Sequence, residues 1–487
     1  MISFLASLAL LIGGYFVYGL VVERIFGIDP KRPTPATTQT DGVDFVPMPA
    51  WKVFLVQFLN IAGLGPIFGA IMGIMYGPAA YLWIVLGTLF AGAVHDFVSA
   101  MISLRAGGVS LPEIVGKELG TGVKQVMRVF SVGLLILVGG VFVVTTSGLV
   151  ASLTPEALDA TFWAVVIFIY YLLATLFPVD KLIGNIYPLF AVVLFFMAVG
   201  LVAIMIFGDV EVPEAFAGGL MNRYAPDLAA THPIFPMLFI SIACGAISGF
   251  HATQSPMMAR CITSERQARP IFYGAMVAEG IVALIWAAAT ITFTDGYEGL
   301  SAYMAEPGHS PGSLVHDISI SWFGVVGGVI AMIGVIAAPI TTGDTALRSA
   351  RLIVADFTHF PQTRFWQRVV ISVPIFALTF GLLQIDFNVL WRYFAWSNQT
   401  LSVFTLWACT VYLARHGRIY AITLIPALFM TVVCTSYLIV APSPEGFGFP
   451  WATGLGAGLT LAIVFSGLFG RYVRSLRAAE PIAERTA

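Results

Sequence analysis

The sequence has few charged residues, and this scarcity excludes most soluble folds. Only 10% of its 487 residues are Asp, Glu, Lys or Arg, whereas soluble domains carry roughly a quarter. Hydrophobic residues make up 58% of the chain, and its mean hydropathy is +0.90. Apolar runs recur along the chain, and no polar region between them is long enough to fold separately. We therefore expect one membrane-embedded unit rather than a soluble enzyme.

Basic charge is not in surplus. The chain has 24 Lys and Arg against 26 Asp and Glu, so it lacks the excess that attracts nucleic acid. It has no GxxxxGK[ST] phosphate loop, which argues against an ATP-driven pump. Four cysteines show no CxxC pair or zinc-ligand spacing, so we expect no disulfide, metal or cofactor: Cys244, Cys261, Cys409 and Cys434. The expected partners are a lipid bilayer and a small-molecule substrate, and the oligomeric state stays open.

Thirteen segments are apolar and long enough to cross a membrane, since a hydrocarbon core about 30 Å thick needs roughly 20 helical residues. The first segment lacks a basic n-region, and its charges follow it, so we expect a retained span rather than a cleaved signal peptide. The predicted limits are 2–22, 53–76, 79–103, 125–151, 161–178, 185–207, 233–256, 270–293, 322–343, 365–383, 390–413, 419–440 and 451–471.

Basic residues segregate when these spans are threaded through a membrane. All of the 24 Lys and Arg except Arg223 and Arg392 then lie on one side. Cytoplasmic loops retain positive charge, so this pattern predicts an external N-terminus and a cytoplasmic C-terminus. The expected organisation is a single transmembrane domain over residues 1–475, followed by a cytoplasmic tail over residues 476–487.

Two predicted spans are interrupted by Gly, Pro and polar residues. The second contains Asn60-Ile-Ala-Gly-Leu-Gly-Pro66, and the seventh contains Cys244-Gly-Ala-Ile-Ser-Gly-Phe-His-Ala-Thr-Gln-Ser-Pro256. Because they are five spans apart, they cross the membrane in opposite directions. Interrupted helices at matching positions of inverted halves indicate a secondary transporter, in which unwound backbone contacts substrate near the midplane. Close helix contact through small residues is the alternative explanation.

A substrate carboxylate would suit these interruptions, because free amides and positive helix ends favour anions. We expect the amides around Gly63, Gly65 and Gly249 to serve this purpose. A neutral His251 is a further candidate for substrate contact. The complete candidate substrate-binding set is Asn60, Gly63, Gly65, Ser248, Gly249, His251 and Gln254.

The layout resembles the LeuT type of fold in the amino acid–polyamine–organocation transporter superfamily. Spans 2–6 and 7–11 would be two inverted repeats of five helices, with one helix before and two after them. Sodium-coupled members hold an ion between carbonyls at the first break and an Ala-x-x-Thr-Ser/Thr motif, and span 9 here contains Ala338-Pro-Ile-Thr-Thr342. The resemblance implies a possible Na⁺ site at Leu59, Ala62, Ala338, Thr341 and Thr342. Alternatively, the two threonines only bond back onto their own helix.

Ionisable residues at bilayer depth are costly and mark candidate functional positions. Glu279 is the deepest carboxylate, and it either carries a coupled proton or is held structurally. His95 and Asp96 are adjacent, so we expect their side chains to point about 100° apart without pairing directly, in a gate or a packing role. Asp344 and Arg348 have the spacing of an ion pair and are expected at a gate or at the surface.

Several longer motifs occur in order along the chain. The interrupted spans, Gly92-Ala-Val-His-Asp96, Ser110-Leu-Pro-Glu-Ile-Val-Gly116 and Thr341-Thr-Gly-Asp-Thr-Ala-Leu-Arg348 resemble the carbon starvation protein A (CstA) family over about residues 1–415. This resemblance implies an inner-membrane transporter of bacteria that takes up peptides or pyruvate when carbon is scarce, with protons or sodium as the coupling ion. The sequence selects neither the substrate nor the ion, and it leaves the direction of transport open.

Two other functional classes, a membrane-embedded enzyme and a starvation sensor, fit the sequence less well than a transporter. A membrane-embedded enzyme would need a metal at His95, Asp96 and His251, but no HExxH or comparable ligand spacing supports one. A starvation sensor would bind substrate without moving it, and it would need a partner because the sequence has no separate signalling domain. We expect a transporter and not an enzyme.

Overall fold

The computed structural model describes residues 1–176, 179–224, 228–229, 231–385 and 387–479, which form helices and loops without strands. The α-helices are α1 (Ile2–Phe26), α2 (Pro35–Thr38), α3 (Ala50–Ala62), α4 (Ala70–Ile74), α5 (Ala79–Gly87), α6 (Ala93–Arg105), α7 (Leu111–Leu119), α8 (Thr121–Ala151), α9 (Ala160–Leu176), α10 (Val179–Phe207), α11 (Ile234–Ser241), α12 (His251–Ala259), α13 (Gly274–Phe293), α14 (Tyr297–Ala305), α15 (Pro311–Thr358), α16 (Phe365–Leu382), α17 (Phe387–Arg415), α18 (Ala421–Val440) and α19 (Trp451–Ala479). Three short segments are π-helices, with wider turns than an α-helix: η1 (Gly65–Gly69), η2 (Thr88–Gly92) and η4 (Arg269–Tyr273). The segment η3 (Glu265–Gln267) is a 3-10 helix, with tighter turns.

The described residues contain nine helices that are long and apolar enough to cross a membrane, or ten if the bent pair Ala50–Ala62 and Gly65–Ile74 counts as one span. Each of the thirteen predicted ranges overlaps a helix. The number thirteen is not confirmed, because α9 has only 17 residues, the seventh range is divided between two short helices, and α17 is not among the candidate spans. The chain is therefore an all-helical, polytopic membrane protein.

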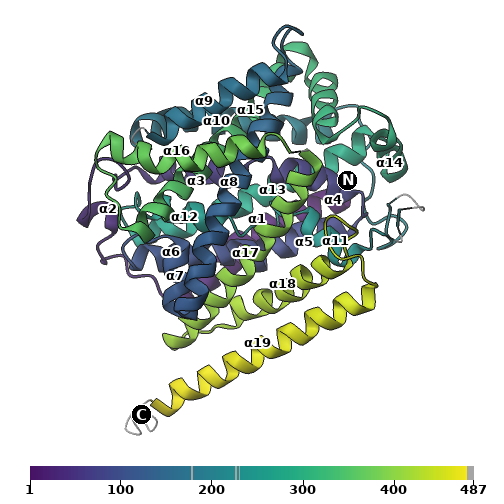
Figure 1. The fold of residues 1–487 in the computed structure, drawn as a ribbon. Coiled ribbons are helices and arrows are strands. Elements are labelled where there is room, and N and C mark those ends of the chain that lie inside the picture. The colour runs from purple at the N-terminus through teal and green to yellow at the C-terminus, as the bar shows by residue number, and fades with distance from the viewer. Residues whose placement is uncertain (177–178, 225–227, 230, 386, 480–487) are drawn as a thin grey trace.

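The helices form one bundle, with the C-terminal pair at its side. α8 packs along α15, and α10 packs against both α15 and α3. In Figure 1, α18 and α19 lie along one flank of the bundle, and α19 packs chiefly on α18. The predicted tail begins inside α19, which continues to Ala479. Residues 480–487 of this tail lie outside the described residues, and so do residues 177–178 of the fifth predicted span.

Both predicted interruptions are present. α3 ends at Ala62, and the chain bends by 52° between α3 and the segment Gly65–Ile74. The second break covers residues 242–250, between the end of α11 and the start of α12. Gly245 in this break has a φ of +94°, which favours glycine because other residues rarely adopt the left-handed region.

The two breaks lie against each other in the middle of the bundle. A Cβ atom added to Gly65 would lie 2.1 Å from the Cβ of Cys244, and one added to Gly245 would lie 3.5 Å from the Cα of Pro66. Such distances leave no room for a side chain at Gly65. Glycine at this position therefore allows two segments almost 180 residues apart in sequence to touch.

The ninth predicted span is longer than expected. α15 runs from Pro311 to Thr358, with a bend at Gly324, whereas the predicted span ended at residue 343. The helix continues beyond the predicted end of the span, where Asp344, Arg348 and Arg351 lower the hydropathy of the sequence. In the folded protein all three side chains are fully buried against other helices, so the helix continues through them.

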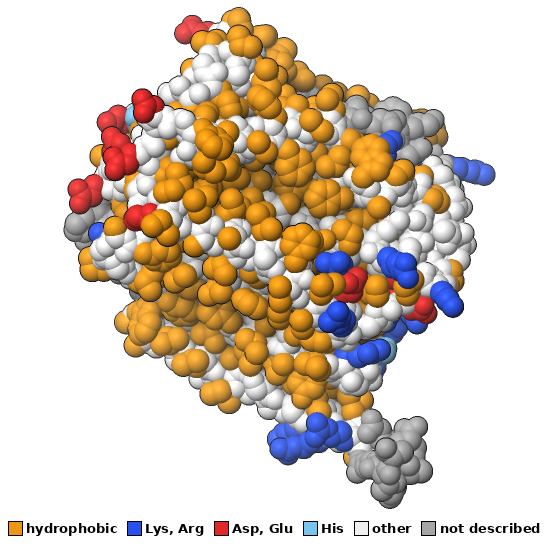
Figure 2. Space-filling model, turned by 180° about the vertical axis from the view of Figure 1, so that it is seen from behind, with side chains coloured by type: hydrophobic (Ala, Val, Ile, Leu, Met, Phe, Trp, Pro, Cys, Tyr) orange, Lys and Arg blue, Asp and Glu red, His pale blue; other side chains and the backbone are white. Residues whose placement is uncertain are grey.

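The outer surface of the bundle suits a lipid environment. Figure 2 shows a broad hydrophobic surface, with most acidic side chains toward one end of the molecule and most basic side chains, with a few acidic ones among them, toward the other. Exposed apolar side chains come from many helices of the bundle, including Val129, Phe196, Val326 and Ile463. Exposed apolar areas of this extent mark contact with a membrane or with partner proteins.

The contact between the breaks predicts that Gly65→Ala destabilises the protein. The added methyl group meets the Cβ of Cys244, which cannot move away by changing rotamer, and overpacking of this kind costs about 1–3 kcal/mol. We expect a lower apparent melting temperature for the variant in detergent.

Gly133→Ala is the matched control, because Gly133 lies inside α8 with nothing within 4 Å of an added Cβ. Alanine favours a helix over glycine, so this variant should melt at the wild-type temperature or above it. Equal melting temperatures for Gly65→Ala and wild type would show that the breaks do not touch as described.

Candidate functional site

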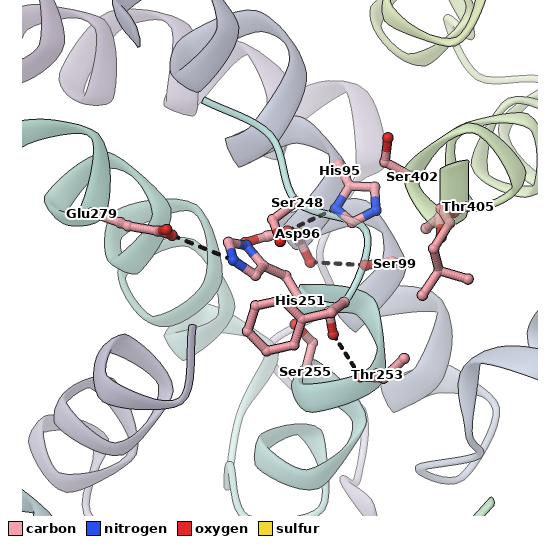
Figure 3. Close-up of polar contacts among 12 residues, drawn as sticks. His95, Asp96, Ser99, Ser248, His251, Thr253, Ser255, Glu279, Ser402 and Thr405 are labelled. Carbon is pink, nitrogen blue, oxygen red and sulfur yellow. Dashed lines mark hydrogen bonds and ion pairs between the residues drawn. The ribbon is translucent and has the colours of Figure 1, made fainter. Parts of the chain in front are cut away.

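A cluster of buried ionisable side chains surrounds His251, the first residue of α12. His251 Nδ1 lies 2.9 Å from Oδ2 of Asp96 on α6, and His251 Nε2 lies 3.5 Å from Oε2 of Glu279 on α13. Figure 3 shows Glu279 on one side of the imidazole and Asp96 with His95 on the other. All four side chains are fully buried. The cluster thus joins residues from three helices at the second break.

Glycine brings α6 into this position. A Cβ atom added to Gly92 would lie 2.3 Å from the carbonyl oxygen of Ala246, which belongs to the second break. Thr88, one turn earlier, donates from its hydroxyl to the carbonyl of Gly245 at 2.8 Å. The segment before α6 is therefore held against the break, and Asp96 reaches His251 from there.

The expectation that His95 and Asp96 do not pair was wrong. His95 Nδ1 lies 2.7 Å from Oδ1 of Asp96, so the carboxylate binds one imidazole with each oxygen. Adjacent Cβ atoms do point in different directions on a helix, but rotation about the side-chain bonds can bring their terminal atoms together. The residues predicted for a gate and the residue predicted for substrate contact therefore belong to one cluster.

Asn398 on α17 contacts the second break, and the sequence interpretation missed it. Its side-chain oxygen accepts from the amide of Phe250 at 2.8 Å, and its carbonyl accepts from the amide of Gly249 at 3.1 Å. Ser248 Oγ lies within 3.0 Å of both polar atoms of the same side chain. Buried backbone groups need such partners, so Asn398 stabilises the unwound segment.

The role expected for Gly249 is corrected by these contacts. Its amide is bonded to Asn398 and so is not free for a substrate carboxylate. A Cβ atom at this position would lie 2.2 Å from the Asn398 carbonyl oxygen, so the glycine permits close packing on α17. The polar run Ser397-Asn-Gln-Thr400 inside an apolar span was the signal that could have identified Asn398.

The other predicted substrate residues differ in their surroundings. Asn60 is fully buried, and within the described part of the chain neither polar atom of its side chain has a hydrogen-bond partner. Gln254 donates to Thr253 Oγ1 at 3.0 Å and accepts from Ser349 Oγ at 3.4 Å. Asn60 at the first break and His251, through Nε2, are therefore residues of this set with unused hydrogen-bonding capacity.

The predicted ion-coupling residues of α3 and α15 lie together. The Thr342 hydroxyl is 2.9 Å from both the Leu59 carbonyl and the Ala338 carbonyl. The Thr341 hydroxyl is 3.3 Å from the Leu59 carbonyl and 2.8 Å from the Ala338 carbonyl. Both threonines thus bond back onto their own helix and also reach the end of α3. Glu279 contacts His251 instead and belongs to the other cluster.

Asp344 and Arg348 are fully buried, so the surface alternative of the prediction was wrong, and the gate alternative stays a prediction. Asp344 Oδ2 accepts from the Tyr187 hydroxyl at 2.6 Å, while Arg348 donates to the Ala174 carbonyl. Arg348 also lies 3.8 Å from Asp44, a residue of the segment that leads into α3. The packing of α9 and α10 over α15 covers these charges.

Two cavities of about 490 Å³ each lie at opposite ends of α15. The first is lined by Phe68, Met72, Thr145, Ser310, His316 and Trp391. The second is lined by Asp44, Gly108, Glu113, Arg260, Leu352 and Phe360. Partial burial disfavours ionisation of Glu113, but hydrogen bonds from Lys124 and Arg128 outweigh it and lower the pKa of this carboxyl group.

Comparisons with known proteins agree on the family. The family model described as "Carbon starvation protein CstA" matches residues 1–160 and 148–325. A Haemophilus influenzae protein described as "Uncharacterized membrane protein" is 42% identical over 345 residues, which cover 62% of this chain and 93% of that protein. "Peptide transporter CstA" of Bacillus subtilis is 26% identical, with 95% of this chain and 94% of that protein covered.

A further relative bears a different name. "Pyruvate/proton symporter BtsT" of Escherichia coli is 28% identical over 346 residues, which cover 58% of this chain and 47% of that protein. Among solved structures, "MhsT in complex with L-phenylalanine" matches with a TM-score of 0.52 and 16% identity, covering 85% of this chain and 97% of that chain. This likeness supports a LeuT-like fold. With the family model matching most of the bundle, the chain belongs to the carbon starvation protein CstA family.

Proposed function

We propose that this chain is a secondary transporter that takes up a peptide or pyruvate together with a cation by alternating access. The observation that carries the proposal is the meeting of two helix breaks at Gly65 and Cys244 inside the bundle. Unwound backbone at membrane depth is a feature of transporter sites. The names of the relatives from Bacillus subtilis and Escherichia coli support the two substrate classes.

The proposed architecture has thirteen spans, with α3 to α10 and α11 to α17 as two inverted repeats. The first helix of each repeat is broken, and the third helices, α8 and α15, pack along each other. The separation of acidic from basic side chains in Figure 2 supports a cytoplasmic location for the basic end, with the N-terminus outside. The proposed location is the bacterial inner membrane.

Alternating access requires a route from each side to the same site. The cavity at Phe68 and the cavity at Asp44 lie at opposite ends of α15, and the first break lies between their linings along the chain from Asp44 to Phe68. We assign the first cavity to the outer route and the second to the inner route. Asp44, which faces Arg348 and Arg351 at 3.8 Å, would belong to the inner gate.

The proposed substrate site lies at the breaks. Asn60 offers an amide group whose polar atoms have no partner among the described residues, and it is three residues from the unwound Gly63. Such a side chain can hydrogen-bond a carboxylate or a peptide group. The Gly63 and Gly65 amides are the remaining backbone donors of the predicted set, whereas Gly249 serves packing.

Sodium is the coupling ion that the contacts favour. The hydroxyls of Thr341 and Thr342 each lie within 3.3 Å of both the Leu59 carbonyl and the Ala338 carbonyl, which brings four oxygen atoms together. Oxygen ligands suit a hard cation, and the hydroxyls would turn their lone pairs toward it. A proton is the alternative, as in the name of the Escherichia coli relative.

Uptake into proteoliposomes tests the proposed function. Labelled pyruvate and a labelled dipeptide are offered separately, each under an imposed sodium gradient and an imposed proton gradient. We expect one of them to accumulate above equilibrium under one gradient, because a symporter couples the two movements. Absence of accumulation with correctly inserted protein would contradict the proposal and favour a sensor that binds without transport.

The proposed sodium site is tested by replacing Thr341 and Thr342 with Ala together. The double variant loses two of the four proposed oxygen ligands, so sodium-stimulated uptake should fall to the sodium-free rate. Thr379→Ala is the control, because this buried hydroxyl bonds only the Ile375 carbonyl of its own helix in the described contacts. Sodium stimulation that survives in the double variant would remove the proposed ion site.

A further inference from the structure

At the second break, three side chains of metal-binding types come together in a way that the sequence spacing did not reveal. The thiol sulfur of Cys244, a ring nitrogen of His251 and a carboxylate oxygen of Glu279 all lie within 4.8 Å of one another, and the three residues are buried. We propose that these three side chains bind one borderline transition-metal ion, with Zn²⁺ as the best match. The site would lie at the point where α12 begins beside α13.

The sulfur of Cys244 has only weak, long contacts, at 3.5 Å with Ser248 Oγ and at 3.6 Å with Asn398 Nδ2, and the other two ligand groups have unpaired atoms. Within the described residues, neither His251 Nε2 nor either carboxylate oxygen of Glu279 has a hydrogen-bond partner, although the two side chains are fully buried. The closest approach between them is 3.5 Å, longer than a good hydrogen bond. Buried polar atoms are nearly always paired, so these atoms fit a site that an ion completes.

Asp96 holds the imidazole in the orientation that such a site needs. Its Oδ2 lies 2.9 Å from Nδ1 of His251, and its other oxygen is bonded to His95. With Nδ1 occupied in this way, Nε2 carries the free lone pair and faces Glu279. Metal-binding histidines commonly donate their other ring N–H to a carboxylate, which sets the tautomer and the ring direction.

The chemistry of the three ligands selects the class of metal. Thiolate, imidazole and carboxylate are the common zinc ligands, with bond lengths of about 2.0–2.3 Å, whereas Mg²⁺ and Ca²⁺ prefer oxygen alone. On binding, the Cys244 thiol loses its proton to solvent as the sulfur–metal bond forms. The thiolate and the Glu279 carboxylate then balance the charge of the ion, and three protein ligands leave a fourth position open.

Metal binding would also affect movement. Cys244 lies within the break, His251 begins α12, and Glu279 belongs to α13, so an ion would tie the break to a neighbouring helix. This part of the inference rests on the proposed function, because it requires the broken helix to move during transport. Zn²⁺ would then act as an inhibitor that holds the break in one arrangement.

Zn²⁺ binding to the purified full-length protein is measured first, by competition with a chromophoric chelator and by metal analysis after desalting. We expect one Zn²⁺ per chain in wild type and in the control Cys409→Ser, which removes another buried cysteine. Cys244→Ser should bind Zn²⁺ with an affinity at least about tenfold lower, since it removes a ligand. No stoichiometric binding by wild type, or unchanged binding by Cys244→Ser, would overturn the site.

Co²⁺ provides a spectroscopic test of the same ligands. A thiolate-to-cobalt charge-transfer band should appear in wild type and in Cys409→Ser and be absent in Cys244→Ser. Glu279→Gln keeps the thiol, so it should retain the band while binding the ion more weakly, and it serves if Cys244→Ser does not fold. A wild-type cobalt spectrum without the band would exclude Cys244 as a ligand.

Zn²⁺ is then added to the proteoliposome uptake experiment. Uptake by wild type and Cys409→Ser should be inhibited, and Cys244→Ser should need about ten times more Zn²⁺ for the same fractional inhibition. Stoichiometric binding without inhibition would overturn the effect on movement. If wild type transports neither solute, the proposed function fails, while the binding and cobalt measurements still decide the metal site.

Discussion

Backbone groups that a helix break exposes inside a membrane must find partners within the protein, and much of this structure depends on that constraint. At the second break, Asn398 of α17 bonds the amides of Gly249 and Phe250. At the first break, the hydroxyls of Thr341 and Thr342 on α15 bond the carbonyl of Leu59. Each break is therefore held by a helix that comes later in the sequence. A shift of α15 or α17 would alter the breaks directly.

Buried charge follows the same principle of pairing inside the protein. Asp96 divides its two oxygens between His95 and His251, and the second imidazole faces Glu279. Asp44 lies near Arg348 and Arg351, which links the segment before α3 to the far end of α15. Ionisable groups at this depth are costly unless partners compensate them. The ion pairs of Asp44 therefore join the far end of α15 to the wall of the second cavity.

Glycines at the helix contacts let these segments approach closely enough for the polar side chains to pair. Gly65 lets the first break touch Cys244, and Gly92 lets α6 approach Ala246. Because small residues allow backbones to come together, the polar side chains can be short and still meet. The thiol, imidazole and carboxylate at the second break gather for this reason, although they come from separate parts of the sequence. Transport and metal binding would thus share one region.

The sequence by itself determined the membrane class, the family and the position of both breaks, because hydropathy and runs of Gly, Pro and polar residues report on a segment's own environment. It also indicated the grouping of Leu59, Ala338, Thr341 and Thr342, through a resemblance. Only the tertiary structure decided that His95 pairs with Asp96, that Asn398 occupies the Gly249 amide, and that α15 continues through buried charges. These features depend on which helices pack together, and the periodicity of one segment carries no information about its neighbours.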